Sequence, residues 1–164
     1  MGLLSLFGCS KPKPNETAIS EKAFSVTLPG EWSRRSEDDG SRIVFKSSSG
    51  REQLTVSLIF WSHRREPEQR LSNFNRVLEL RQQAEIHEFA PSAITMTAPV
   101  VTEQSGIHAG RYSGSEPAAQ RRFNCLLLCS SSLVATFYYE AVGLPQSEAE
   151  ERASAILASA KLTE

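Results

Sequence analysis

Three pairs of adjacent arginines are the residues of this sequence whose chemistry is best suited to binding a ligand or a partner. The pairs are Arg34-Arg35, Arg64-Arg65 and Arg121-Arg122, and each lies at or just beyond the end of an expected strand. Because a guanidinium group binds carboxylate or phosphate through two parallel hydrogen bonds, such a cluster can hold an anionic ligand or an acidic partner. The alternative is that the arginines pair with neighbouring glutamates on the surface, where ion pairs contribute little to stability. The candidate contacts for an anion or an acidic partner are Arg64, Arg65, Arg121 and Arg122.

The other polar residues lack the spacing of a catalytic, metal or cofactor site. The run Gly110-Arg111-Tyr112-Ser113-Gly114 does not match the G-x-S-x-G of a nucleophilic serine, and we interpret it as a strand end with a glycine bend. Asp38-Asp39 is a pair within one turn, and none of the three histidines has metal-ligand spacing to another. We therefore expect no catalytic residue, no metal and no cofactor. The alternative, an enzyme with an unrecognised site, requires the arginine pairs and the histidines to converge in one pocket.

Two of the three cysteines, Cys125 and Cys129, lie in one expected strand. Four residues of extended chain place them about 13 Å apart on the same face, whereas a disulfide needs Cα atoms within about 7 Å. We therefore expect two buried free thiols that act as small apolar groups.

The third cysteine, Cys9, raises the question of a membrane anchor. Leu6-Phe7-Gly8-Cys9 resembles the lipobox at which a bacterial lipoprotein signal is cut, and the lysines and prolines after it are typical of a polar tether. No Lys or Arg precedes Cys9, although an export signal needs a cationic segment and a longer apolar one. Two interpretations stay open: a cytoplasmic protein, which we favour, or an envelope lipoprotein with Cys9 as its lipidation site and its only link to the membrane.

Length and charge set further bounds on the class of protein. A chain of 164 residues predicts one domain, which we place at 22–162 after a tail or tether at 1–21. The net charge of −1 does not favour a nucleic-acid-binding protein, because such a protein needs an excess of cations. No apolar run approaches the roughly 20 residues of a membrane-spanning helix.

Hydrophobic periodicity predicts the first half of the fold. Alternation of apolar and polar residues indicates strands at 24–28, 43–46 and 54–60. The period changes at Pro67, which is favoured in the first turn of a helix, and we expect a helix over 67–88. Its apolar stripe contains Leu71, Phe74, Val77, Leu78 and the stem of Arg81. Its solvated residues are expected to be Arg70, Arg76, Glu79, Gln82 and Glu85.

The second half is predicted to contain four strands and a helix. The strands are expected at 93–101, 106–114, 121–129 and 133–142. Pro99 indicates an edge or a bulge, and the strand at 133–142 is apolar on both faces, as in a covered central strand. Ser147 and Glu150 have the spacing of a capping box. The helix that follows is expected to bury Ala149, Ala153, Ile156, Leu157 and Ala160.

The order β-β-β-α-β-β-β-β-α predicts an α+β fold, with one antiparallel sheet of about six to seven strands flanked by two helices. Three stretches carry a resemblance to a known family: 24–32, with the pattern F-S-V-x-x-P-x-x-W; the strand at 53–61 that leads into the Pro67 helix; and 135–141 with the closing helix that ends at 156–162. They resemble the PsbP-like α/β/α sandwich, which includes DcrB-like proteins.

Most members of that family are non-catalytic binding modules, and they do unrelated things. The resemblance therefore implies the fold and a non-enzymatic binding or assembly module of a bacterium. It predicts that a protein partner is engaged through a face or an edge of the sheet. It assigns no functional residue.

Overall fold

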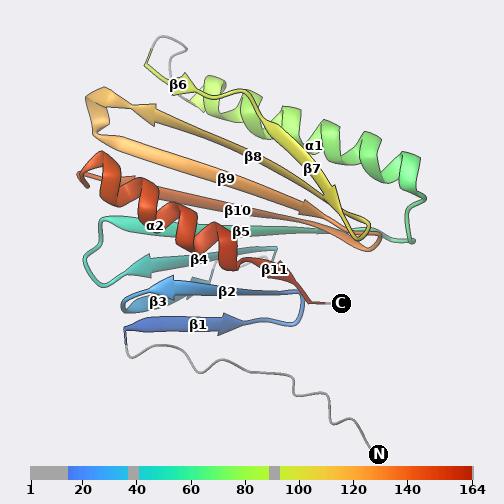
Figure 1. The fold of residues 1–164 in the computed structure, drawn as a ribbon, viewed down its shortest axis with the longest axis horizontal. Coiled ribbons are helices and arrows are strands. Elements are labelled where there is room, and N and C mark those ends of the chain that lie inside the picture. Colours follow the sequence, from blue (N-terminus) through green and yellow to red (C-terminus); the bar gives the residue numbers. More distant parts are fainter. Residues whose placement is uncertain (1–14, 37–40, 89–92, 164) are drawn as a thin grey trace, which may run out of the picture.

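A computed structural model describes residues 15–36, 41–88 and 93–163 (Figure 1). Its main element is an antiparallel sheet of eight strands, more than the six to seven expected. The sheet follows the order β3-β4-β5-β10-β9-β8, and both β6 and β7 pair with β8 at the far edge. The strands are β3 (Trp32–Ser36), β4 (Arg42–Ser47), β5 (Glu52–Phe60), β6 (Thr95–Met96), β7 (Val100–Gln104), β8 (Ile107–Glu116), β9 (Arg121–Cys129) and β10 (Leu133–Val142).

A second, three-stranded sheet is the main departure from the expected single sheet. It contains β1 (Glu16–Ser20), β2 (Phe24–Pro29) and β11 (Lys161–Leu162), in the order β1-β2-β11. Part of the stretch predicted as a tail, 16–20, is therefore paired strand, while residues 1–14 lie outside the described residues. Local alternation shows that 24–28 is a strand, but it cannot tell which sheet the strand joins, because pairing is a long-range choice.

Two helices lie on opposite faces of the main sheet (Figure 1). Helix α1 (Pro67–Glu88) has the predicted bounds. Helix α2 (Gln146–Ser159) begins one residue before Ser147, and Pro145 is its N-cap without a side-chain cap, so the predicted capping box is wrong. Ser147 is already inside the first turn, where its hydroxyl cannot act as the cap. Neither helix is apolar enough over its length to cross a bilayer.

The core has two parts, one on each face of the main sheet. Between this sheet, α2 and the small sheet lie Phe24, Leu54, Phe137 and Ile156, all fully buried. Under α1 lie Phe74, Phe123 and the two free thiols of Cys125 and Cys129, as predicted. The predicted burial is confirmed for Ala149, Ala153, Ile156 and Leu157 of α2 and for Ala160, which is the C-cap of the helix.

Strand β10 lies at the centre of the sheet, as its two apolar faces predict. It pairs along its length with β5 on one side and with β9 on the other, and the turn Ser130–Ser132 joins it to β9. Its odd-numbered residues, such as Phe137 and Tyr139, face α2, and its even-numbered residues, such as Tyr138, face α1. Consecutive side chains of β10 therefore reach two different environments.

Gly110 and Gly114 lie inside β8, so their interpretation as a strand end with a bend is wrong. A Cβ atom at Gly110 would come within 2.8 Å of Cζ of Phe74 in α1. A Cβ atom at Gly114 would clash with the ring of Phe123 in β9. Glycine is needed at these positions because large side chains of α1 and β9 cover the backbone of β8 closely.

The edge formed by β6 and β7 contains a bulge. Met96 is opposite Gly114 and Val100 is opposite Arg111, so three residues, 97–99, face only two, 112–113. Pro99 lies in this bulge, which confirms the prediction of an edge or a bulge at this residue. Proline is tolerated there because it removes no ladder hydrogen bond from a central strand.

Candidate functional site

A polar hollow lies on the α1 face of the main sheet, over β4, β5 and β10. Its volume is about 320 Å³. Arg42, Ser57 and Thr136 are directly opposite one another across β4, β5 and β10, so their side chains share this face. Helix α1 contributes Arg81 and Glu85, and β9 contributes Arg121. The other lining residues are Gln53, Thr55, Tyr138 and Glu140.

A chain of hydrogen bonds joins Arg121, Tyr138 and Glu85 at one side of the hollow. Nη2 of Arg121 donates to the Tyr138 hydroxyl at 2.5 Å, and that hydroxyl donates to Oε2 of Glu85 at 3.1 Å. Nε of Arg121 also donates to Oε2 of Glu140 at 3.1 Å. Only 4% of the Glu85 side chain and 11% of the Arg121 side chain are exposed, so these groups hold fixed positions.

Arg81 completes this network from the helix. Its Nη2 donates to Oε1 of Glu85 at 3.2 Å, and its guanidinium carbon lies 5.0 Å from the centre of the Tyr138 ring. Its Nε is buried and has no hydrogen-bond partner among the residues that the structure describes. Arg81 is thus both a counterion for Glu85 and a cation stacked on an aromatic face.

The electrostatics of the hollow favour the binding of anions over proton transfer. Burial, with the nearby Glu85 carboxylate, raises the pKa of Tyr138 above its ordinary value of 10.0, so the phenol stays neutral at neutral pH. Burial lowers the pKa of Arg121, but Tyr138 and the carboxylates of Glu140 and Glu85 raise it by more, so its pKa lies above the ordinary value and the guanidinium stays charged. Three arginines and two glutamates give the lining a formal charge of +1 (3 − 2). The arrangement can hold a carboxylate or another anion through guanidinium and hydroxyl donors.

The structure separates the four arginines predicted as contacts. Arg121 lies in the hollow, but Arg122 points to the opposite face, beside β6 and α2. Arg64 is exposed in the loop between β5 and α1, and the guanidinium carbon of Arg65 lies 5.4 Å from the centre of the Trp61 ring. The candidate lipidation site, Cys9, is outside the described residues.

Sequence reasoning missed Arg42, Arg81 and Glu85 as members of this site. Glu85 was expected to be solvated but is buried, because residues 74, 78, 81 and 85 follow one helical stripe that faces the sheet. That stripe, together with the i, i+4 spacing of Arg81 and Glu85, was the signal that could have identified a buried ion pair. Nothing local distinguishes Arg42 from other surface arginines.

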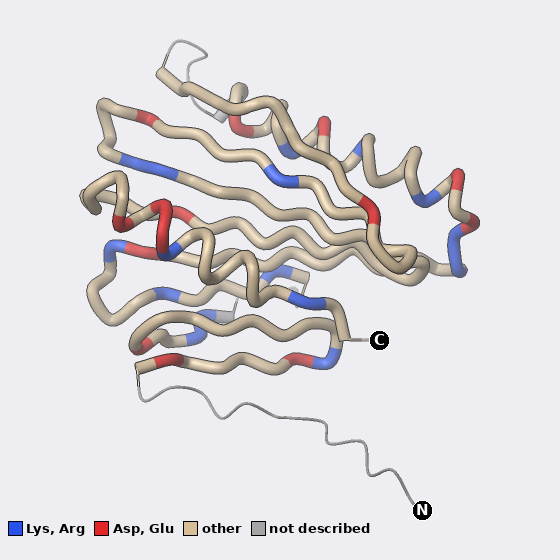
Figure 2. The backbone as a smooth tube through the Cα atoms, in the orientation of Figure 1, with Lys and Arg blue, Asp and Glu red and all other residues tan. Residues whose placement is uncertain are grey.

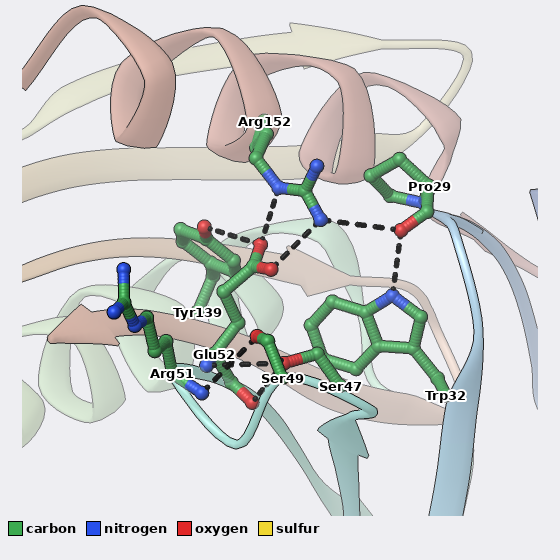
Figure 3. Close-up of polar contacts among 8 residues, drawn as sticks. All are labelled: Pro29, Trp32, Ser47, Ser49, Arg51, Glu52, Tyr139 and Arg152. Carbon is green, nitrogen blue, oxygen red and sulfur yellow. Dashed lines mark hydrogen bonds and ion pairs between the residues drawn. The ribbon is translucent and has the colours of Figure 1, made fainter. Parts of the chain in front are cut away.

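A second polar cluster lies on the other face of the sheet (Figure 3). The buried carboxylate of Glu52 accepts two hydrogen bonds from Arg152 of α2, at 2.6 and 2.7 Å, and one from the Tyr139 hydroxyl at 2.9 Å. The Pro29 carbonyl accepts from Nη2 of Arg152 at 3.4 Å and from Nε1 of Trp32 at 2.9 Å. Since α2 and the turn after β2 are tied here to β5 and β10, we assign this cluster a structural role.

The convergence required by the enzyme alternative is not found in the described part of the chain. His63 lies in an exposed loop, and His108 is buried in β8, 3.9 Å from Glu103; neither lines the hollow. The side chain of His87, and Asp38 and Asp39, lie outside what the structure describes. Among the described residues, no three His, Cys, Asp or Glu side chains are placed to hold a metal ion.

The fold is similar to that of two solved structures. One is the solution structure of cyanobacterial PsbP (CyanoP) from Synechocystis sp. PCC 6803, with a TM-score of 0.64, 11% identity and coverage of 99% of both chains. The other is the crystal structure of LpqN, involved in cell envelope biogenesis of Mycobacterium tuberculosis, with a TM-score of 0.51, 13% identity and coverage of 91% of both chains. No protein-family model and no curated protein matches the sequence. The likeness confirms the predicted PsbP-like fold.

Proposed function

We propose that this chain is a non-enzymatic binding module that holds an acidic segment of a protein partner in the polar hollow. The observation that carries the proposal is the meeting of Arg42, Arg81 and Arg121 in one hollow, although they come from β4, α1 and β9. The Arg121 guanidinium is held by burial and hydrogen bonds, so it loses little freedom when it binds a carboxylate, which favours recognition of an acidic side chain.

The position of α1 supports this assignment. The helix packs over β8 and β9 and leaves the part of the same face over β4 and β5 to the hollow. Arg81 and Glu85 lie on the side of α1 that borders this open part. A partner that docks here would contact both the helix and the sheet, which is a common way to build a specific interface on a rigid scaffold.

The experiment compares retention of partner proteins by three forms of the chain. Wild type, Arg42→Glu and Lys46→Glu are immobilised and exposed to an extract of the native host, and bound proteins are quantified by mass spectrometry. Lys46 is the matched control, because it lies on the same strand and face as Arg42 but does not line the hollow. We expect some host proteins to bind to the wild type and to Lys46→Glu but not to Arg42→Glu. Equal loss or equal retention by the two variants would contradict the proposal.

A second candidate function is that of an envelope lipoprotein tethered through Cys9. The run Leu6-Phe7-Gly8-Cys9 favours it, and LpqN, which shares the fold, is involved in cell envelope biogenesis. The intact mass of the protein from membrane and soluble fractions of its host tests it. A species that begins at an acylated Cys9 in the membrane fraction would support the tether, and an unprocessed soluble species would contradict it.

A further inference from the structure

Strand β7 is an edge that other strands leave open. Among the described residues it pairs with β8 alone, and all five of its side chains are exposed. Val100 is 64% exposed and Val101 is 44% exposed, although β-branched apolar residues usually pack against a neighbour. An exposed edge strand with such residues is a template for pairing with another strand.

The turn between β7 and β8 determines which backbone groups face outward. Ser105 and Gly106 both have positive φ, 52° and 76°, and they form a two-residue hairpin turn. In such a hairpin the two residues that flank the turn form backbone hydrogen bonds with each other. The next residue of each strand points its N–H and C=O groups away from the partner strand. Val101 and Glu103 are therefore the residues of β7 whose backbone groups point to the open edge.

A groove of about 640 Å³ lies beside this edge, on the α2 face of the sheet. Val100 and Thr102 of β7 form one wall, Ala109 and Leu128 form the floor, and Ala160 and Leu162 form the other wall. A strand added to β7 would turn alternate side chains toward this face, because successive residues of a strand point to opposite sides. The edge and the groove thus form one site for an extended chain.

The charges at the groove indicate the chemistry of that chain. Its lining contains Arg111 and Lys161 but no carboxylate. Glu103, the acidic residue of β7, lies on the other face, opposite His108. This local positive charge stands out because acidic and basic residues are otherwise interspersed and the whole chain has a net charge of −1 (Figure 2). Charge complementarity therefore favours an acidic segment over a second copy of this chain.

We infer that an extended segment of a protein partner, with apolar and acidic residues at every second position so that both kinds face the groove, adds as a strand to the open edge of β7. Its backbone pairs with Val101 and Glu103, its apolar side chains enter the groove, and its carboxylates meet Arg111 and Lys161. Main-chain pairing supplies affinity in this mode of recognition, and the groove supplies specificity. The site is on the opposite face from the polar hollow and does not depend on it.

Selection of random linear peptides displayed on phage against the intact chain tests this inference. The enriched peptides are expected to have apolar and acidic residues at every second position, on the one face that meets the groove. The Val101→Pro variant is expected to bind a selected synthetic peptide at least about tenfold more weakly, because it loses an outward N–H group. It leaves the β7–β8 pairing intact, since that N–H does not face β8, and Val101→Ala is the control that keeps the donor. Circular dichroism and the urea midpoint confirm that each variant is folded.

A second pair of variants covers the case in which Val101→Pro does not fold. Charge reversal of the exposed Arg111 and Lys161 to Glu changes the groove without changing the edge, and it is expected to weaken the same peptide about tenfold. Arg42→Glu, in the polar hollow, is expected to leave the affinity for this peptide unchanged. A negative result at the β7 edge is therefore distinct from a negative result for the function proposed at the polar hollow. Peptides without acidic residues, or equal affinity for the variants and the wild type, would overturn the inference. So would a dimer of the wild type that Val101→Pro dissociates, because the edge would then bind a second copy.

Discussion

The hydroxyls of Tyr138 and Tyr139, adjacent in β10, donate to two buried carboxylates on opposite faces of the main sheet. Tyr138 bonds to Glu85 of α1 at 3.1 Å, and Tyr139 bonds to Glu52 of β5 at 2.9 Å. Each carboxylate also has arginine partners, Arg81 for Glu85 and Arg152 for Glu52. The central strand thus connects two buried ionic clusters, one beside the polar hollow and one that holds α2.

Arg152→Ala is expected to destabilise the protein strongly, because it leaves the carboxylate of Glu52 buried without its counterion. Removal of one partner of a buried ion pair costs about 3–5 kcal/mol. Urea unfolding measures the change. The control is Arg51→Ala, next to Glu52, whose exposed side chain points away from the cluster (Figure 3) and should cost no more than about 0.5 kcal/mol. The double variant Glu52→Gln/Arg152→Ala should recover part of the loss, and equal costs for the two single arginine variants would contradict the structural role.

Gly110→Ala is expected to lower stability by about 1–3 kcal/mol, because its new methyl group would lie 2.8 Å from Cζ of Phe74. Helix α1 would have to move off β8, or Phe74 would have to leave its preferred rotamer. A double-mutant cycle with Phe74→Leu checks the cause by urea unfolding. If the clash with the ring is responsible, the double variant costs less than the sum of the single variants. Simple additivity would argue against this contact as the reason for the glycine.

Stability is expected to fall in alkaline solution as buried thiols begin to ionise in the unfolded chain. Burial raises the pKa of Cys125 from its ordinary value of 9.0 to about 11, and that of Cys129 shifts in the same direction. Because the thiol of the unfolded chain loses its proton first, ionisation favours the unfolded state above pH 9. The contribution of the buried Cys125 thiol to the free energy of unfolding is therefore fully present below pH 9 and is lost as the pH rises toward 11. For Cys125 it is about 3 kcal/mol. The buried tyrosines act in the same direction at higher pH.

Urea unfolding at a series of pH values from 8 upward measures this loss, and Cys125→Ala should have a shallower slope than the wild type. In a Cys9→Ser variant, the two remaining thiols should react with Ellman's reagent at pH 8 only after unfolding. Rapid reaction of either thiol in the folded protein would show that it is accessible and would contradict the burial argument.

The arginine pairs show where sequence reasoning reached its limit. Adjacent residues of a strand point to opposite faces, so Arg121 and Arg122 could not both belong to one site. The partners that Arg121 has in the hollow, Arg42 and Arg81, are distant in the sequence and carry no motif. Glu85 was misassigned because a charged residue on a helical stripe is usually solvated, and only its arginine and tyrosine partners make its burial tolerable.

By itself the sequence determined the elements whose signals are local. Pro67 and the apolar stripe after it specify α1, apolar residues on both faces specify β10 as a covered strand, and four residues of strand keep Cys125 and Cys129 apart. Only the tertiary structure decided that β2 joins a separate sheet, that three arginines from three elements meet in one hollow, and that no other strand of the described residues pairs with the outer edge of β7. Periodicity records how each segment is buried, whereas the choice of neighbour depends on packing between segments far apart in the chain.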